Sequence, residues 1–267
     1  QPGRGDLYVL DVGVSEFADD DIPDLRYAAK DARDVAALFS TMPQSTFDNI
    51  YTEIIADGDA IPPNRQRVLD AFDFLSRAGA EDTVILFFAS HGLTVDGEYY
   101  FAPHDARIDA PATRRATMDD LNLDTFLRWE DIFEPMRLAA GKRLMIVDTC
   151  ASADISGPID LFSLQKRSAS SQIAFVTASA GNQASQELRM EQQGLFTFTL
   201  LKALRDRIDP NRDGIVSLQE VFNLSRQMVP NWRENKNLEQ TPQLMAPDFL
   251  TSMPLTSSDV TTERAIR

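Results

Sequence analysis

The segment 83–90, Thr-Val-Ile-Leu-Phe-Phe-Ala-Ser, is apolar at almost every position and constrains the fold more than any other part of the chain. A short continuous apolar run predicts a strand buried on both faces, and such strands occur in parallel sheets that helices cover on both sides. The segments 7–14, 143–149 and 172–179 have the same character. Segments with apolar residues at helical spacing lie between them. This alternation predicts an α/β fold, a three-layer α/β/α sandwich around a mostly parallel sheet of about six strands.

The remaining elements follow from periodicity and from turn-forming residues. Helices are expected at 27–42, 64–78, 123–140, 195–207 and 218–229, and further strands at 49–55, 98–102 and 243–250. Asn64 is the expected N-cap of the second helix, and Gly79 follows its end. A polar stretch without a predicted element covers 151–171. We expect one domain over 1–250 and a flexible C-terminal tail over 251–267.

Composition and charge narrow the range of functions. The chain has 267 residues and a single cysteine, so no internal disulfide can form, and a reducing compartment, the cytoplasm, is expected. The longest apolar run, Val84–Ala89, is too short to cross a bilayer, and no signal peptide is visible. The first residue is Gln1 rather than Met, so we expect further domains in a longer chain. The net charge of −15 disfavours nucleic acids and anionic membranes and favours cationic partners.

Two of the predicted strands lead directly into residues suited to nucleophilic chemistry, His91 and Cys150. In parallel sheets the C-terminal ends of the strands meet at the edge where active sites form. A thiol is a weak nucleophile at neutral pH unless a neighbouring imidazole takes its proton. The backbone N–H groups of Gly92 and Cys150 are candidates for an oxyanion hole. The alternative for Cys150 is a buried core residue. The other histidine, His104, is expected to be a solvated loop side chain.

Four segments resemble the caspase-like cysteine peptidases, particularly the metacaspases and their bacterial relatives. The strings 87–92, Phe-Phe-Ala-Ser-His-Gly, and 146–152, Ile-Val-Asp-Thr-Cys-Ala-Ser, are similar to family strands that end in Ser-Gly-His-Gly and in Asp-x-Cys. The segment 25–32 resembles the family's Leu-x-x-(Ala/Cys)-x-x-Asp-Ala pattern, and residues within 178–197 resemble its segment after the fifth strand. The resemblance covers most of the chain and implies a caspase-like fold.

The resemblance also implies roles for individual residues. Cys150 is expected to be the nucleophile and His91 its general base, in an endopeptidase that forms an acyl-enzyme intermediate. Metacaspases cut after Arg or Lys and hold that residue with two aspartates, and the matching positions are Asp31 and Asp148. Period-two alternation places Asp148 on the same face of its strand as Cys150. The alternative readings are that Asp148 caps a loop and that Asp31 is a solvated helix residue.

Basic residue pairs raise the question of self-cleavage. Lys166 and Arg167 lie in a Ser-rich stretch where many family members carry a processing loop, and Arg114 and Arg115 lie in an earlier charged loop. A peptidase that prefers basic residues could cleave itself at either pair. The alternative, that these are ordinary exposed charges, is left open.

A motif near the C-terminal end matches the twelve-residue calcium loop of the EF-hand, in which oxygen ligands recur at fixed positions. The candidate calcium ligands are Asp209, Asn211, Asp213, Ile215, Ser217 and Glu220. The alternative is a structural turn that never binds metal. Metacaspases are often activated by calcium at a different acidic site, and Asp119 and Asp120 lie in the corresponding part of the chain.

The sequence therefore predicts a cysteine endopeptidase that acts on protein or peptide substrates with Arg or Lys before the scissile bond, with calcium as a modulator. Its chemistry needs no cofactor. A first alternative is a catalytically silent, calcium-responsive interaction module that has kept the fold. A second is a cysteine-dependent hydrolase or transferase of small molecules.

Overall fold

A computed structural model describes residues 4–43, 45–110, 117–150, 161–180, 183, 185–232 and 239–258. For residues 118, 150 and 161–163 it describes the backbone alone.

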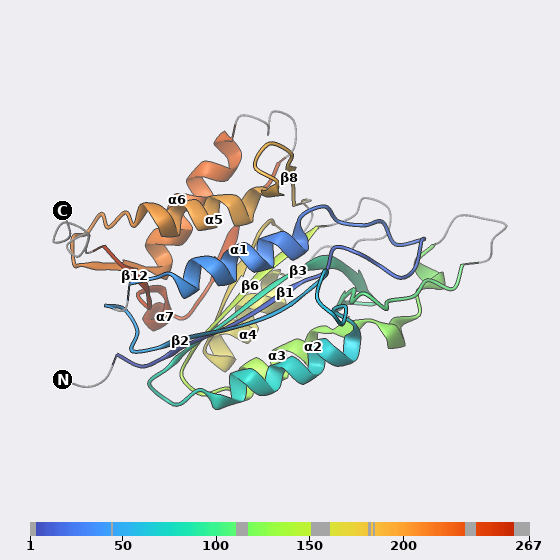
Figure 1. Ribbon diagram of the computed structural model, residues 1–267, viewed down its shortest axis with the longest axis horizontal. Helices are drawn as coiled ribbons and strands as arrows, with labels where there is room; N and C mark the ends of the chain where they lie inside the picture. The colour runs from blue at the N-terminus through green and yellow to red at the C-terminus, as the bar shows by residue number, and fades with distance from the viewer. Residues whose placement is uncertain are drawn as a thin grey trace.

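The centre of the molecule is a twisted sheet that runs β11-β7-β6-β3-β1-β2 (Figure 1). Five of its strands are parallel, namely β1 (Leu7–Gly13), β2 (Ile50–Ala56), β3 (Thr83–Val95), β6 (Lys142–Cys150) and β7 (Ile173–Thr177). The short strand β11 (Gln243–Met245) pairs antiparallel with β7 at one edge. The prediction of a mostly parallel sheet of about six strands is confirmed.

Helices cover both faces of the sheet (Figure 1). One face carries α1 (Ala28–Ser40), α5 (Leu195–Asp206), α6 (Leu218–Met228) and α7 (Asp248–Thr251), which share one hydrophobic core with the sheet. The other face carries α2 (Arg65–Ala71), which continues as the 3-10 helix Phe72–Arg77, together with α3 (Trp129–Leu138) and α4 (Leu161–Ser171). Asn64 caps α2, because its side-chain oxygen accepts a hydrogen bond from the Arg67 backbone N–H.

Strand β3 is longer than predicted, and this difference shapes the site. It continues through His91 to Val95 and folds back as a hairpin with β4 (Glu98–Phe101). Asp96 and Gly97 both have positive φ, as a tight Asp-Gly hairpin turn requires. Strand β5 (Leu127–Arg128) pairs with β4, so the helix expected over 123–140 begins only at Trp129. Leu127 and Arg128 fit the helical periodicity of the sequence, but they pair with β4 of the hairpin and form a strand instead.

Other boundaries also differ from the predictions. Part of the polar stretch 151–171 forms α4, and residues 248–250, expected to continue a strand, lie in α7. Residues 251 and 254–257 of the predicted tail belong to regular elements. Strand β12 (Pro254–Ser257) pairs antiparallel with β10 (Ile215–Ser217) and buries Leu255. Residues 259–267 lie outside the described residues.

The short elements complete the description. They are β8 (Glu187–Leu188), paired with β9 (Gln193–Gly194), and the 3-10 helices Met118–Asp120, Leu123–Thr125 and Val229–Asn231. Across the described ranges, no helix combines the length and the apolar character that a membrane span needs.

Candidate active site

The dyad residues lie side by side at the C-terminal edge of the sheet. In the parallel pairing of β3 with β6, His91 is the register partner of Cys150. Neighbouring strands lie about 4.8 Å apart, so these two backbones are immediate neighbours. The His91 side chain is only 6% exposed. The sheet thus brings together two residues that are 59 positions apart in the sequence, the difference between 150 and 91.

The orientation of His91 is set by a backbone carbonyl that sequence reasoning missed. Its Nε2 lies 2.6 Å from the carbonyl oxygen of Pro23, and its ring packs against Phe17 with centroids 5.1 Å apart. A carbonyl oxygen can only accept, so Nε2 must carry the proton. In the neutral ring Nδ1 is then the basic nitrogen, the form that a general base needs. Backbone acceptors leave no side-chain signal in a sequence, and for that reason Pro23 could not be found.

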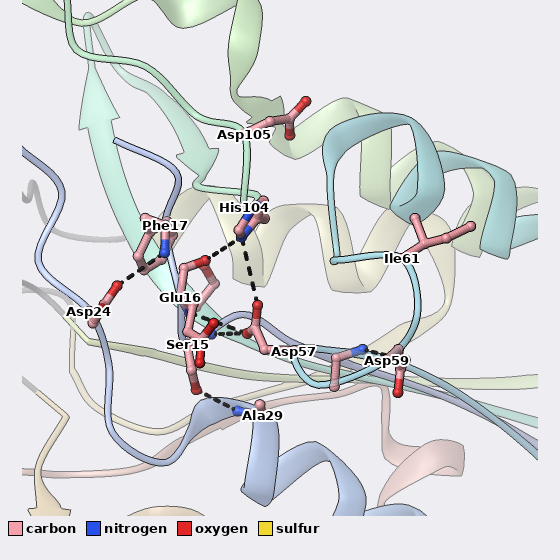
Figure 2. Close-up of polar contacts among 12 residues, drawn as sticks. Ser15, Glu16, Phe17, Asp24, Ala29, Asp57, Asp59, Ile61, His104 and Asp105 are labelled. Atoms are coloured by element: carbon pink, nitrogen blue, oxygen red, sulfur yellow. Dashed lines mark hydrogen bonds and ion pairs between the residues drawn. The ribbon is translucent and has the colours of Figure 1, made fainter. Parts of the chain in front are cut away.

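The loop that carries Pro23 is held in place by Asp57, at the end of β2 (Figure 2). Its Oδ2 accepts hydrogen bonds from the backbone N–H groups of Ser15, at 2.5 Å, and Glu16, at 3.3 Å. His104 Nδ1 donates to the Glu16 carbonyl oxygen at 2.8 Å and lies 3.8 Å from Asp57 Oδ1. Burial raises the pKa of Asp57, and these backbone hydrogen bonds oppose that rise. His104, predicted to be a solvated loop side chain, is a quarter exposed and also contacts a buried carboxylate and the loop backbone.

The two candidate specificity aspartates meet beside the dyad. Asp31 and Asp148 are 3% and 5% exposed, so Asp31 is not the solvated helix residue of the alternative reading. Asp148 accepts hydrogen bonds from Ser185 Oγ at 2.6 Å and Thr197 Oγ1 at 2.7 Å. Asp31 Oδ2 accepts one from the Gly194 backbone N–H at 2.9 Å. Asp31 Oδ1 is buried and has no hydrogen-bond partner among the described residues.

The electrostatics of this pair are unusual for carboxylates. Burial raises the pKa of Asp31 well above its ordinary value, and the neighbouring Asp148 raises it further. Burial likewise raises the pKa of Asp148, against the hydrogen bonds from Ser185 and Thr197. Within the described part of the chain, no Lys, Arg or His forms an ion pair with either carboxylate. The pair is therefore a buried acidic site whose charge is not compensated by a basic side chain of the described residues.

Gly194 separates the two carboxylates at close range. A Cβ atom at this position would lie 2.9 Å from Asp31 Oδ2 and 3.1 Å from Asp148 Oδ2. Sequence reasoning placed Gly194 in a family-like segment but assigned it no role. The close approach shows why glycine is needed, since any side chain would enter the space between the acids.

A second glycine, Gly92, permits the packing that surrounds the dyad. A Cβ atom there would overlap the Tyr99 hydroxyl group. That hydroxyl group forms a hydrogen bond of 2.8 Å with Thr149 Oγ1. Because Thr149 directly precedes Cys150, this contact ties the β3–β4 hairpin to the end of β6. The oxyanion role of the Gly92 and Cys150 backbone N–H groups stays a prediction.

The candidate calcium loop folds as a self-bonded turn. Asp209 Oδ2 accepts from the Gly214 backbone N–H and from Ser258 Oγ. Glu220 forms a capping box with Ser217 at the start of α6, and Ile215 lies in β10. Asn211 and Asp213 accept from the backbone N–H groups two residues further on.

Neither acidic segment is a group of metal-ligating side chains in the described part of the chain. Among the described residues, no group of three or more His, Cys, Asp or Glu side chains is placed to hold a metal ion. In the other acidic segment, Asp120 Oδ2 accepts hydrogen bonds from the backbone N–H and hydroxyl groups of Thr117. Calcium binding remains a prediction, and the proposed reaction does not require calcium.

The predicted processing sites differ in their setting. Lys166 and Arg167 lie inside α4 rather than in an open loop. Arg167 forms an ion pair with Glu130 and its guanidinium group lies over the Phe133 ring, 5.3 Å from the centroid. Arg114 and Arg115 lie outside the described residues.

Comparison with known proteins identifies the class to which this fold and site belong. The family model of the caspase domain matches residues 8–252, so the chain belongs to the caspase-domain family of cysteine peptidases. A search of curated proteins by sequence finds no match.

Solved structures with the same fold come from bacteria and insects. The chain is similar to protein GSU0716 from Geobacter sulfurreducens, with a TM-score of 0.61 and 17% identity over 95% of this chain and 100% of that one. It is also similar to caspase-1 from Spodoptera frugiperda, with a TM-score of 0.56 and 11% identity over 96% and 88% of the two chains. The Drosophila initiator caspase Dronc matches with a TM-score of 0.52 and 12% identity over 94% and 84%. At these identities the likeness establishes the caspase-like fold.

Proposed function

We propose that this chain is a cysteine endopeptidase that cleaves proteins after Arg or Lys. The observation that supports this specificity best is the acidic pair, Asp31 and Asp148. Both carboxylates are buried beside Cys150 without an ion-pair partner among the described residues, and Asp31 Oδ1 has no hydrogen-bond partner there. A guanidinium or ammonium group is the natural counter-ion for such a pair, and Arg can donate to both oxygens of a carboxylate at once. An acidic side chain would instead be repelled.

The chemistry begins with proton transfer to His91. Its Nε2–H donates to the Pro23 carbonyl oxygen, so Nδ1 accepts the proton of the Cys150 thiol. The thiolate sulfur attacks the carbonyl carbon after the bound Arg or Lys. The negative charge that develops on the carbonyl oxygen is stabilised by the backbone N–H groups of Gly92 and Cys150.

The intermediate then collapses towards the acyl-enzyme. The C–N bond breaks, and His91 Nδ1–H gives its proton to the departing amine. A thioester between Cys150 and the substrate remains. Water, deprotonated by His91 Nδ1, attacks this thioester, and the acid product leaves as the thiol reforms.

Substrate binding and thiolate formation are coupled in this arrangement. Two carboxylates close to Cys150 oppose formation of a thiolate, because like charges repel. A cationic side chain that binds between them removes this repulsion. Basic substrates are therefore expected to promote the chemical step as well as to bind.

The first experiment compares fluorogenic peptides that end in Arg, Lys, Asp or Ala, with calcium or with chelator, and uses Cys150→Ala as the blank. We expect cleavage after Arg and Lys to be much faster than cleavage after Ala or Asp, and none by the blank. Cleavage only after Asp would contradict the role of the acidic pair but keep the peptidase. If Cys150 also fails to react with iodoacetamide in the folded protein, the silent interaction module becomes the better description.

A further inference from the structure

A small apolar pocket lies against His91, and the mechanism above does not use it. Its apolar lining consists of Ile22, Leu93, Ala102, Ile108, Leu121 and Phe126. His91, Gly92 and Pro23 complete the wall. Most of these residues are buried, whereas Leu121 is half-buried and Pro23 is exposed. Among the described residues, no Asp, Glu, Lys or Arg lines it, so these walls offer no fixed charge to compensate a charged ligand group.

The pocket and the acidic pair lie on opposite faces of the sheet edge. Asp148 and Asp31 contact α5 and its preceding turn, on the face covered by α1 and α5. The apolar residues of the pocket belong instead to the hydrophobic core shared with α2 and α3. His91 lines the pocket and is the register partner of Cys150, so it connects the pocket to the strand that carries Cys150 and Asp148.

The walls of the pocket are held by contacts that exist without a ligand. Ile108 and Leu121 form a β-bridge with each other. The backbone N–H of Ile108 donates to Asp19 Oδ2 at 2.7 Å, which connects this wall to the loop that carries Pro23. A ligand would therefore meet a preformed site, and little ordering would be required when it binds.

The direction of the reaction indicates which part of a substrate reaches this pocket. The leaving amine takes its proton from His91, so the residue that follows the scissile bond must depart on the His91 side of Cys150. We propose that the pocket is a leaving-group subsite that accepts a short aliphatic side chain from the first residue after the scissile bond. This inference rests on the proposed peptidase function and adds a second specificity determinant to it.

The size of the pocket sets the preferred side chain. The volume of the pocket is about 20 Å³ on the scale on which one water molecule needs about 10–15 Å³. This is room for the methyl groups of Ala or Val, and too little for an aromatic ring. Each buried methyl or methylene group is worth about a fourfold gain. We therefore expect Val after the scissile bond to raise kcat/KM by roughly 4- to 20-fold over Gly.

The test uses internally quenched peptides that share Arg before the scissile bond and differ only in the next residue, as Gly, Ala, Val, Phe, Asp or Lys. The parent protein is expected to prefer Val and Ala over Gly, and to cleave the Phe, Asp and Lys peptides less well than Gly. Leu121→Ala enlarges the pocket and should move the preference from Val towards Phe. Leu123→Ala is the matched control, because Leu123 packs against the same core without lining the pocket. It should keep the parent's order of preference.

Binding separates this proposal from the peptidase proposal. The same peptides are titrated against Cys150→Ala, with and without Leu121→Ala, and followed by fluorescence anisotropy. Preference for Val in binding, lost in the double variant, supports the pocket even if the parent cleaves nothing, in which case only the peptidase proposal falls. Equal binding and equal cleavage of all six peptides would overturn the pocket while leaving the peptidase intact. Absence of both cleavage and binding preference would overturn both.

Discussion

Two groups of carboxylates in this molecule have pKa values shifted in opposite directions. Asp31 and Asp148 are buried beside the dyad, and their pKa values are raised, first by burial. Asp209, in the loop that resembles a calcium site, has a lowered pKa, because hydrogen bonds from Ser258 and from backbone N–H groups outweigh the effect of burial. Among the described residues the first pair has no ion-pair partner and one acceptor oxygen without a hydrogen bond, whereas the loop supplies hydrogen-bond donors to its own acids. The comparison teaches that similar acidic residues can differ in how many hydrogen-bond donors the fold supplies, which makes the buried pair the stronger candidate for a cation site.

The largest expected effect comes from removing one charge of the buried pair. Asp148→Asn keeps the shape of the side chain but removes the charge that would pair with a substrate cation. We expect kcat/KM for Arg peptides to fall by about 10²- to 10³-fold, as for other buried charge pairs. Steady-state kinetics with Arg and Ala peptides measures the effect.

The matched control is Asp206→Asn, at the exposed end of α5, where Asp206 pairs with Lys202. It should leave both substrates unaffected. If Asp148→Asn slowed the Arg and Ala peptides equally, the residue would serve the architecture of the site rather than its specificity.

Binding of a basic peptide should also depend on pH, with a defined sign. The raised pKa values of Asp31 and Asp148 mean that the pair gains its charge only above the ordinary carboxyl range. Affinity for an Arg peptide should therefore rise with pH through these raised pKa values, by about tenfold per pH unit for each proton released, and then level off. Titration of Cys150→Ala with the peptide measures this, and a citrulline peptide of equal shape should show no such rise.

How much of this site could be predicted from the sequence depends on whether a contact is made by a distinctive side chain or by a backbone atom. The chemistry proposed for His91, Cys150 and Asp148 resides in side chains at strand ends, which periodicity and family resemblance both predict. The Pro23 carbonyl could not be found, since every residue has a carbonyl group and only the path of the loop selects one. The contacts of Ser185 and Thr197 with Asp148 were missed for a related reason, because hydroxyl groups 37 and 49 positions away carry no pairing signal.

The same reasoning explains the errors in the fold. The helix predicted from residue 123 has the right periodicity, but residues 127–128 are claimed by pairing with β4, and only the hairpin beyond His91 makes that strand available. Strand β12 was read as tail because its partner β10 lies inside the loop that resembles a calcium site. Long-range pairing overrode local pattern in both cases.

A third carboxylate, Asp11, sharpens the comparison because it has neither a cation nor a donor. It lies in β1, is fully buried, and neither of its oxygens has a partner among the described residues. Burial raises its pKa well above the ordinary value. Asp11→Val should stabilise the fold by about 1–3 kcal/mol, since it removes an unsatisfied buried polar group and suits a strand.

The gain from Asp11→Val should also depend on pH. Because its pKa is raised in the folded protein, Asp11 is neutral below the ordinary carboxyl pKa and costs least stability there. The parent protein then loses stability as the pH rises through the folded-state pKa of Asp11. The variant should therefore gain more at pH 8 than at pH 4. Urea unfolding at the two pH values measures this. A destabilised variant would show that Asp11 has a partner that the described residues do not include.

The smallest expected effect is at the self-bonded loop. Asp209→Ala removes the acceptor for Gly214 N–H and Ser258 Oγ, and so loosens the link between this turn and the end of β12. We expect Tm to fall by a few degrees at neutral pH in the presence of chelator. Because the pKa of Asp209 is lowered, its stabilising effect is present above the ordinary pKa and lost as the pH falls through the lowered value. The Tm values of the variant and the parent should therefore become equal in acid.

A Tm measurement in millimolar calcium tests whether the same loop binds metal. A rise in Tm for the parent but not for Asp209→Ala would show that the loop binds calcium. The loop and the buried pair would then both bind cations, and would differ in which cation each prefers.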